Sequence, residues 1–119
     1  MAATNEAVLD DLALAIFSLR RLVTALEEKV LDPALPSNEK QALLAELPIL
    51  DNDRRDLAAR FAAMQAKKAK LPPPNESIAK ELKAATTDLS ARIAEARSVS
   101  ALLTLATTVA SAAWKAVAA

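Results

Sequence analysis

The 119-residue chain contains no glycine, and this absence constrains its fold more than any other feature. Average usage would supply about 7% glycine. Glycine adopts left-handed backbone conformations without strain, and tight two-residue β-hairpins usually require such conformations. The absence therefore argues against a β-rich fold. It also excludes glycine-rich phosphate loops and dinucleotide-binding turns, whose backbone must approach a ligand closely.

Composition and proline spacing indicate helices. Hydrophobic residues make up 53% of the chain and aromatic residues only 3%, so the core must consist of leucine, valine, isoleucine and alanine. Leucine and alanine are strong helix formers. Prolines stand at three places that divide the chain into helical stretches: 33 and 36, 48, and 72–74. One core suits this length. We predict a single domain over residues 1–119, an all-α helical bundle of four helices in an up-down arrangement.

The first predicted helix covers residues 5–31, with Thr4 or Asn5 as its N-cap. One of its faces carries apolar residues at alternating spacings of three and four, a pattern that packs helix against helix: Leu9, Leu12, Ile16, Leu19, Val23, Leu26 and Val30. The opposite face places Leu14, Phe17 and Arg21 among charged residues. Exposed leucine and phenylalanine lower solubility. We therefore expect either another helix of the chain or a partner to cover Leu14 and Phe17, unless they are single exposed apolar residues of the kind that is ordinary on protein surfaces.

The second predicted helix covers residues 38–70, with Asn38 as its N-cap and a kink or short break at Pro48, because proline removes a backbone hydrogen bond and clashes with the preceding turn. After that break, Asp51, Asp53 and Asp56 would occupy the start of a new helical segment, where acids complement the helix dipole. These oxygens are conceivable ligands for a hard cation. The loop lacks the glycine and the terminal glutamate of an EF-hand, however.

The C-terminal part begins with an interhelical connector at residues 71–74. From residue 75 to 119 there is neither glycine nor proline, and an apolar stripe continues to Arg97: Ile78, Leu82, Ala85, Leu89, Ile93 and Ala96. This part is either one long helix or two helices with a break near Ser98 to Ser100, where serines compete for backbone hydrogen bonds. We favour the break because it closes a four-helix bundle.

Residues 98–114 carry no charge. A helix that is neutral around its whole circumference is usually buried, so we predict a central core helix. An oligomer interface and membrane insertion, with Trp114 as an interfacial anchor, are the alternatives. The segment is short for a membrane span, which takes about 20 apolar residues.

Catalytic and metal-binding side chains are scarce. The chain has no cysteine and no histidine, so thiolate and imidazole ligands are missing. We expect no metal, no cofactor, no enzyme activity and no small-molecule substrate. Ser77 and Lys80 have the Ser-x-x-Lys spacing of penicillin-binding enzymes, but the other elements of that site are missing. A hydrolase that uses this pair or two carboxylates remains a minor alternative.

The charge balance bears on possible partners. Fifteen basic and 15 acidic residues give zero net charge, which disfavours nucleic-acid binding. Residues 1–11 lack the form of a secretory signal, and we expect a cytoplasmic location. We predict a non-enzymatic helical protein–protein interaction module: an adaptor, an inhibitor or immunity-type protein, or a self-associating oligomeric scaffold. Its candidate contact residues are Leu14, Phe17, Arg21 and Trp114. A membrane-associated bundle that uses residues 98–114 is the alternative.

Overall fold

A computed structural model describes residues 3–118, and within that range the chain is all-α. It contains α1 (Asn5–Val30), α2 (Ser37–Ala66), the short 3₁₀ helix η1 (Lys68–Lys70), α3 (Glu76–Thr86), α4 (Leu89–Glu95) and α5 (Val99–Ala118). Five α-helices thus replace the four that the sequence predicted. The molecule is elongated, with extents of 50 × 25 × 16 Å.

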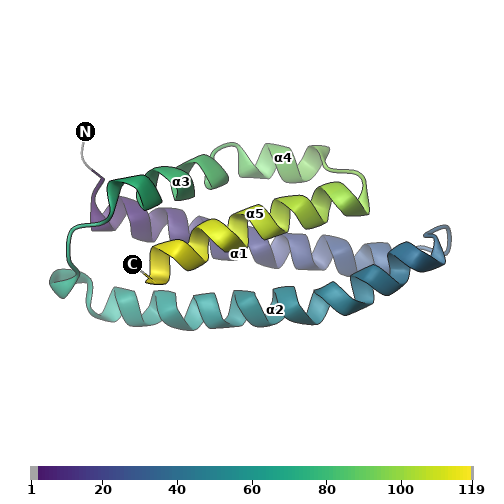
Figure 1. Cartoon of the computed structure of the whole chain (residues 1–119), viewed down its shortest axis with the longest axis horizontal. Helices are drawn as coiled ribbons and strands as arrows, with labels where there is room; N and C mark the ends of the chain where they lie inside the picture. The colour runs from purple at the N-terminus through teal and green to yellow at the C-terminus, as the bar shows by residue number, and fades with distance from the viewer. Residues whose placement is uncertain (1–2, 119) are drawn as a thin grey trace.

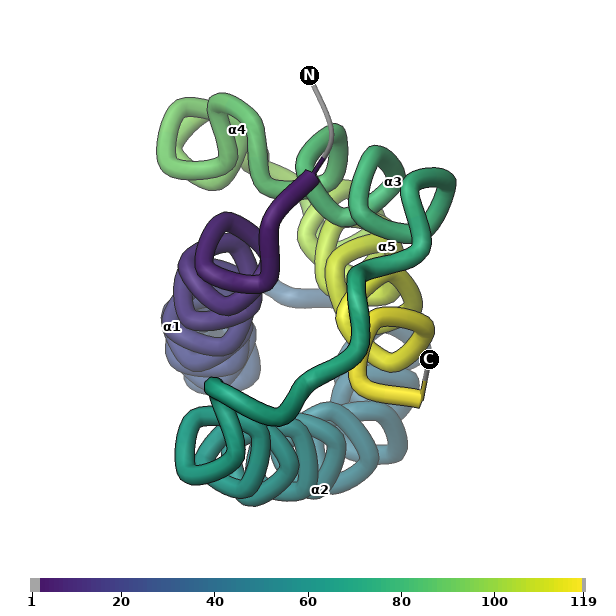
Figure 2. Tube along the Cα trace, turned by 90° about the vertical axis from the view of Figure 1, so that its left-hand side faces the viewer, coloured from purple at the N-terminus to yellow at the C-terminus, as the bar shows by residue number. Residues whose placement is uncertain are grey.

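The helices form three layers. The α1 helix packs against α2, α3 and α5, and α5 packs against α1, α2 and α3. Seen from the end, α2 lies on one side of the α1–α5 pair, and α3 and α4 lie on the other side (Figure 2). Along the long axis, α3 and α4 follow one another in the same direction, and α5 returns beneath them (Figure 1). The α1–α5 pair is therefore the middle layer and supplies most of the core.

The α1 helix begins as predicted, because the Thr4 hydroxyl accepts a hydrogen bond from the Ala7 amide at 3.1 Å. Most of the predicted apolar stripe is buried, and Ile16 and Val30 pack against the core partly buried. Residues beside that stripe are buried as well: Val8, Ala15, Ser18 and Leu22. The buried face is wider than predicted because α1 has neighbours on several sides.

The α2 helix runs through Pro48 without interruption, so the predicted break there is wrong. Pro48 is exposed and its neighbours Leu47 and Leu50 face the core, so packing on both sides of the proline holds the helix together. The predicted kink stays a prediction. The predicted Asn38 cap is also wrong, because the helix begins at Ser37 without a side-chain cap bond.

Because α2 continues through Pro48, the acidic residues that follow this proline do not lie at a helix start as predicted. Asp51, Asp53 and Asp56 lie in the middle of α2 rather than at the start of a helix, so no helix dipole accounts for them. The buried residues of α2 are Leu43, Leu50 and Leu57, spaced seven apart. Such heptad spacing places them on one narrow seam facing α1 and α5.

The predicted third helix is divided at Thr87 and Asp88 into α3 and α4, a break that the sequence did not predict. Asp88 has φ of 54°, the one positive φ among residues 3–118. The hydroxyls of Thr86 and Thr87 donate to carbonyls of the last turn of α3, and the Arg92 guanidinium donates to the Thr87 carbonyl at 2.8 Å. The same guanidinium donates to the Ala84 and Ala85 carbonyls, which a continuing helix would have bonded to the amides of residues 88 and 89.

The predicted break near Ser98 is confirmed, since α4 ends at Glu95 and α5 begins at Val99. The Ser98 hydroxyl accepts from the Ala101 amide at 3.0 Å and caps α5. One face of α5 is buried, including Leu102, Ala106 and Val109, while the other is exposed. The predicted central core helix is therefore buried on one face only. Among the described helices, α5 is the one long and apolar enough to cross a membrane, and 39% of its most apolar stretch is buried.

Candidate functional site

Phe17 is a prominent exposed apolar side chain, with 59% of its surface accessible. It lies on the outer face of α1, and helical spacing places Leu14 and Arg21 on the same face. Leu14 is 40% exposed, and Arg20 and Arg21 are exposed beside it. We call Leu14, Phe17, Arg20 and Arg21 the Phe17 ridge. Within residues 3–118 both side chains are exposed, so the expectation that another helix of the chain covers them is wrong, and cover by a partner stays a prediction.

The Phe17 ridge separates two grooves, and the outer face of α1 lies between α4 and α2 (Figure 2). The groove towards α4 has a volume of about 390 Å³ and is lined, besides the ridge, by Thr24, Ala25, Glu28 and Ile93. The groove towards α2 has a volume of about 320 Å³ and is lined, besides the ridge, by Ala13, Ile16, Arg54, Ala58 and Phe61. Phe17 and Arg20 line both grooves.

The charged groups around the ridge are mostly cationic. Arg21 Nη1 donates to Ser90 Oγ at 3.2 Å, which joins α1 to α4. Neither Arg20 nor Arg21 forms an ion pair with any described residue. Arg54 pairs with Asp51 at 2.8 Å, and its hydrogen bond lowers the pKa of the Asp51 carboxyl below the ordinary value. Arg20 and Arg21 therefore keep their charge available for an outside carboxylate.

Trp114 lies apart from the Phe17 ridge. It is half-buried on α5, and the Arg60 guanidinium stands 5.3 Å from the centre of its ring. On α2, Arg60 lies on the edge next to α5, whereas Arg54 and Ala58 lie on the edge next to α1. The structure thus brings Leu14, Phe17 and Arg21 together and separates Trp114 from them. Sequence spacing could not show this, because the separation depends on how α5 returns through the bundle.

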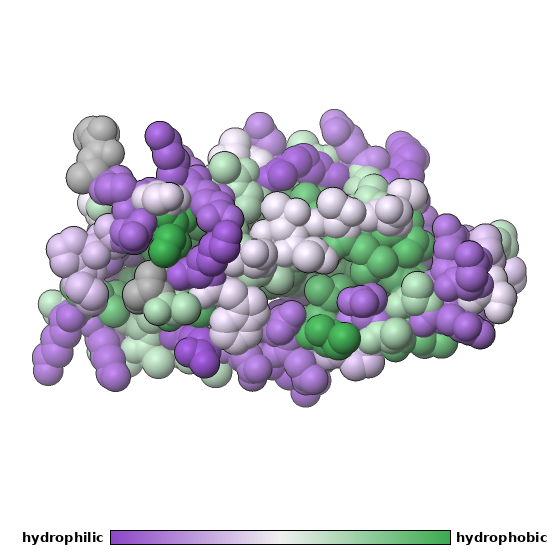
Figure 3. All heavy atoms as spheres, in the orientation of Figure 1, coloured by the Kyte–Doolittle hydropathy of each residue, from purple (hydrophilic) through white to green (hydrophobic). Residues whose placement is uncertain are grey.

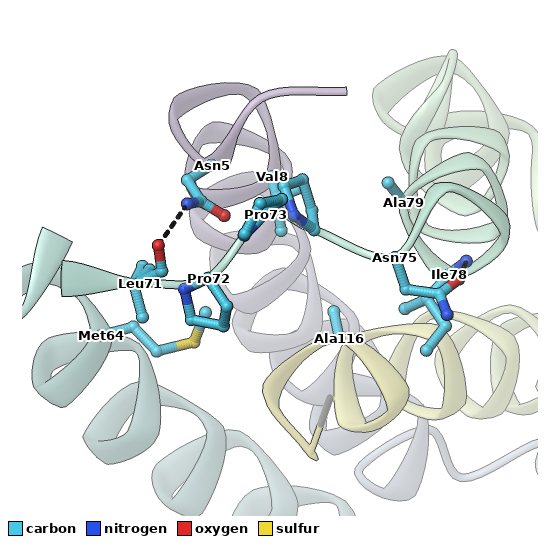
Figure 4. A pocket seen from close by; sticks show the side chains of 11 residues that line it. Asn5, Val8, Met64, Leu71, Pro72, Pro73, Asn75, Ile78, Ala79 and Ala116 are labelled. Carbon is cyan, nitrogen blue, oxygen red and sulfur yellow. Dashed lines mark hydrogen bonds between the residues drawn. The ribbon is translucent and has the colours of Figure 1, made fainter. Parts of the chain in front are cut away.

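A pocket of about 480 Å³ lies at one end of the bundle, beneath residues 71–74, which we call the strap (Figure 4). Its lining includes Val8 of α1, Met64 of α2, Ile78 and Ala79 of α3, and Ala116 of α5. Leu71, the three prolines and the amides of Asn5 and Asn75 complete it.

The strap is fixed at both ends of the pocket. Asn5 Nδ2 donates to the Leu71 carbonyl at 3.3 Å, and Asn75 Oδ1 accepts from the Ile78 amide at 3.1 Å as the N-cap of α3 (Figure 4). The sequence predicted only an interhelical connector at residues 71–74. The proline run was the available signal, because three prolines cannot fold back onto the helix ends as tightly as a helical turn.

A further surface lies along α5. Near-neutral residues run along this helix, and hydrophobic side chains gather between α5 and α2 (Figure 3). The hydroxyls of Thr107 and Thr108 donate to carbonyls of their own helix at 2.8 and 2.9 Å. On α2, Leu44 and Ile49 are more than half exposed.

The remaining candidates show no assembled chemistry. Ser77 and Lys80 are exposed, and no hydrogen bond joins them in the described structure. Asp51 is engaged by Arg54 and Arg55, at 2.8 and 3.2 Å. Within residues 3–118 no group of three acidic side chains is placed to hold a metal ion.

Comparisons of this chain with protein-family models, with known proteins and with solved structures find no match. A functional assignment must therefore come from the geometry of the chain itself.

Proposed function

We propose that this protein is a non-enzymatic interaction module that binds a protein partner, or a second copy of itself, through the Phe17 ridge. The observation that carries this proposal is the 59% exposure of Phe17 between two grooves. Aromatic and arginine side chains are the residue types enriched at the centres of protein interfaces, and the ridge presents both. Burial of the phenyl ring against a partner would remove a large apolar surface from water.

The two grooves favour a helical partner. A partner helix laid along α1 would place side chains spaced three and four apart into the grooves on either side of Phe17. Arg20 and Arg21 stand beside the ring, where they would pair with carboxylates of that partner. The hydrogen bond from Arg21 to Ser90 holds one of these arginines in place before binding. This binding mode is compatible with an adaptor, an inhibitor and a self-associating scaffold.

The bundle would act as the rigid support of this surface. We propose that α3 and α4 together form the third arm of a four-arm up-down bundle, with α1, α2 and α5 as the other arms. Their buried residues support this, because Leu82, Ala85 and Leu89 continue one apolar stripe across the break. The consecutive course of α3 and α4 along the long axis also supports it (Figure 1).

The first test compares two pairs of exposed apolar residues by size-exclusion chromatography with light scattering. Leu14→Ser with Phe17→Ser alters the ridge, and Leu44→Ser with Ile49→Ser is the matched control on α2. If the wild type self-associates, we expect the ridge variant to be a folded monomer and the control to keep the wild-type mass. Dissociation in the control alone would place the interface on α2 and refute the ridge.

If the wild type is a monomer, capture experiments take the place of the mass measurement. Immobilised wild type and the control pair should then retain a common protein that the ridge variant does not retain. Equal retention by all three proteins would contradict the proposal.

A membrane-associated bundle is the second candidate, and the length and apolar composition of α5 favour it. Insertion of α5 into lipid would separate Trp114 from Arg60, which now stands over its ring. Anionic and neutral phospholipid vesicles should then shift the fluorescence of Trp114 to shorter wavelength. Unchanged fluorescence and unchanged helix packing with both vesicle types would remove this candidate.

A further inference from the structure

We propose that the pocket beneath the strap binds a small, neutral aromatic molecule that carries one hydroxyl group. This site is separate from the Phe17 ridge. The pocket residues come from α1, α2, α3 and α5, whereas the ridge lies on the outer face of α1. Success or failure at one site therefore does not decide the other.

The walls of the pocket are apolar. Val8, Ala79 and Ala116 are buried, and Ile78 is half-buried beside them. The volume of about 480 Å³ lies within the range of roughly 300–1,000 Å³ that is typical of small-molecule sites. Water bound against such walls finds few hydrogen-bond partners. An apolar ligand that displaces this water would therefore be favoured.

Met64 and the strap favour an aromatic ring. Met64 and Pro72 line the same side of the pocket, and Pro73 lies next to them (Figure 4). Thioether sulfur makes favourable contacts with aromatic rings. Proline rings present rigid apolar surfaces that pair with aromatic groups in polyproline recognition. Together these residues form a wall suited to a flat ring.

The polar groups at the rim favour a hydroxyl. Asn5 uses its Nδ2 for the Leu71 carbonyl, which leaves its Oδ1 as an acceptor. Asn75 uses its Oδ1 for the Ile78 amide, which leaves its Nδ2 as a donor. Asn5 and Asn75 lie at opposite ends of the strap (Figure 4), so a hydroxyl group pairs with one of them: it donates to Asn5 Oδ1 or accepts from Asn75 Nδ2.

The absence of charged lining residues favours a neutral ligand. All the residues that line the pocket are apolar or amides. An ionised group in this pocket would lose hydration without gaining a direct counter-ion, which is costly. A carboxylate on the same ring should therefore bind more weakly than a hydroxyl.

The experiment uses 4-propylphenol as the probe and follows the methyl groups of the full chain by NMR. We expect saturable shifts at the methyl groups of Val8, Met64, Ile78, Ala79 and Ala116, with a Kd of about 1 mM or tighter for a probe of this size. Two comparison probes, 4-propylbenzoate and propylbenzene, test the charge and the hydroxyl. We expect the benzoate to bind at least about tenfold more weakly than the phenol, and propylbenzene to bind more weakly as well.

Two variants fill the pocket with a larger side chain. Ala79→Leu and Ala116→Leu should each raise the Kd at least about tenfold. Ala84→Leu, at an exposed position of the same helix as Ala79, is the matched control and should leave the Kd unchanged. Circular dichroism confirms that each variant is folded. The wild-type shifts remain decisive even if both leucine variants fail to fold.

Three results would overturn the proposal. The first is an absence of saturable shifts at the pocket methyl groups up to the solubility of the phenol. The second is a benzoate affinity equal to that of the phenol, because the ligand class would then be wrong. The third is an unchanged Kd in a folded Ala79→Leu or Ala116→Leu protein, because the probe would then bind elsewhere.

Discussion

The two longest helices, α1 and α2, differ sharply in how much of their surface the fold buries. The α1 helix buries nine of its 26 residues, whereas α2 buries three of its 30. The difference follows from position, because α1 lies in the middle layer and α2 in an outer layer (Figure 2). Eleven of the 26 residues of α1 nevertheless remain exposed, and Phe17 is the most exposed large apolar side chain among them.

The two helices also differ in how packing holds them in the bundle. The α1 helix is buried on several sides, whereas the buried residues of α2 lie on one heptad seam of Leu43, Leu50 and Leu57, beside which Leu47, Phe61 and Met64 are partly buried. Removal of one seam side chain should therefore loosen a large part of α2. Removal of one core side chain of α1 should loosen a smaller part of α1.

The largest expected effects come from the core leucines. Leu19→Ala and Leu57→Ala should each lower the free energy of unfolding by about 2–5 kcal/mol, because both side chains are fully buried and leave cavities. Phe17→Ala should cost less than about 1 kcal/mol, because the ring is mostly exposed. Chemical denaturation followed by circular dichroism measures all three. Equal losses at Leu19 and Phe17 would show that Phe17 belongs to the core.

The local consequence for α2 can be tested with the same proteins. Amide hydrogen exchange in Leu57→Ala should accelerate mainly within α2, because the seam is its main attachment. In Leu19→Ala the acceleration should extend to several helices, since α1 packs against most of the others. Identical exchange patterns in the two variants would contradict the distinction between the helices.

Pro48→Ala should stabilise the protein by about 1–2 kcal/mol. An interior proline lacks the amide needed for a helical hydrogen bond and disfavours the helix by about 3 kcal/mol relative to alanine, while the stiffer unfolded chain offsets about 1 kcal/mol of this. Thermal and chemical denaturation measure the change, and Pro36→Ala, before the first turn of α2, serves as the control. A loss of stability in Pro48→Ala would show that the proline shapes α2 to fit its seam.

Ser18→Ala, in the middle layer, should raise stability, in contrast to the substitutions of the core leucines. Ser18 is fully buried, and its hydroxyl has no hydrogen-bond partner within the described structure. Removal of an unsatisfied buried hydroxyl should raise the free energy of unfolding by about 1 kcal/mol. Thr24→Ala, at an exposed site of the same helix, is the control. A clear loss in Ser18→Ala would reveal a partner for the hydroxyl in solution.

The smallest effects are pH-dependent and have opposite signs in the two helices. The hydrogen bond from Arg54 lowers the pKa of Asp51 in α2, so its stabilisation is present above the ordinary value of 3.8 and is lost as pH falls through the lowered pKa. Asp51→Asn should therefore cost about 0.5 kcal/mol or less at neutral pH. The difference from wild type should vanish in acid.

Asp11 in α1 should behave in the opposite way. Burial raises the pKa of Asp11, with nearby Lys83 opposing and Asp10 reinforcing the shift. A carboxyl with a raised folded pKa stabilises the protein below 3.8 relative to neutral pH, and this contribution is lost as pH rises through the raised value. Asp11→Asn should therefore be more stable than wild type at neutral pH. The free energy of unfolding should be measured against pH for both variants. A change of the same sign in Asp51→Asn and Asp11→Asn at neutral pH would contradict this assignment.

The sequence predicted the helical class, the N-cap of α1 at Thr4 or Asn5, and the break near Ser98, because these follow from local chemistry. It failed at Pro48, where tertiary packing overrides the local cost of proline. It failed again at Thr87 and Asp88, because no glycine or proline marks that break. The Arg92 side chain of α4 instead bonds the carbonyls of Ala84, Ala85 and Thr87 at the break.

The candidate sites were predictable to different degrees. Helical periodicity was enough to place Leu14, Phe17 and Arg21 on one exposed face. The flanking grooves were not predictable, since they depend on Phe61 of α2 and Ile93 of α4. The pocket beneath the strap was missed entirely, because its residues come from four helices that meet only after folding.

The left-handed residue Asp88 determines which central helix is screened from solvent. The α3 helix packs on both α1 and α5, and after the turn at Asp88 α4 packs mainly on α1 (Figure 2). This leaves an open cleft of about 500 Å³ where Ala96 of the following loop faces Thr104 and Leu105 of α5. The first half of α5 therefore stays open to water along this cleft, with the hydroxyl groups of Thr104 and Thr108 at its surface.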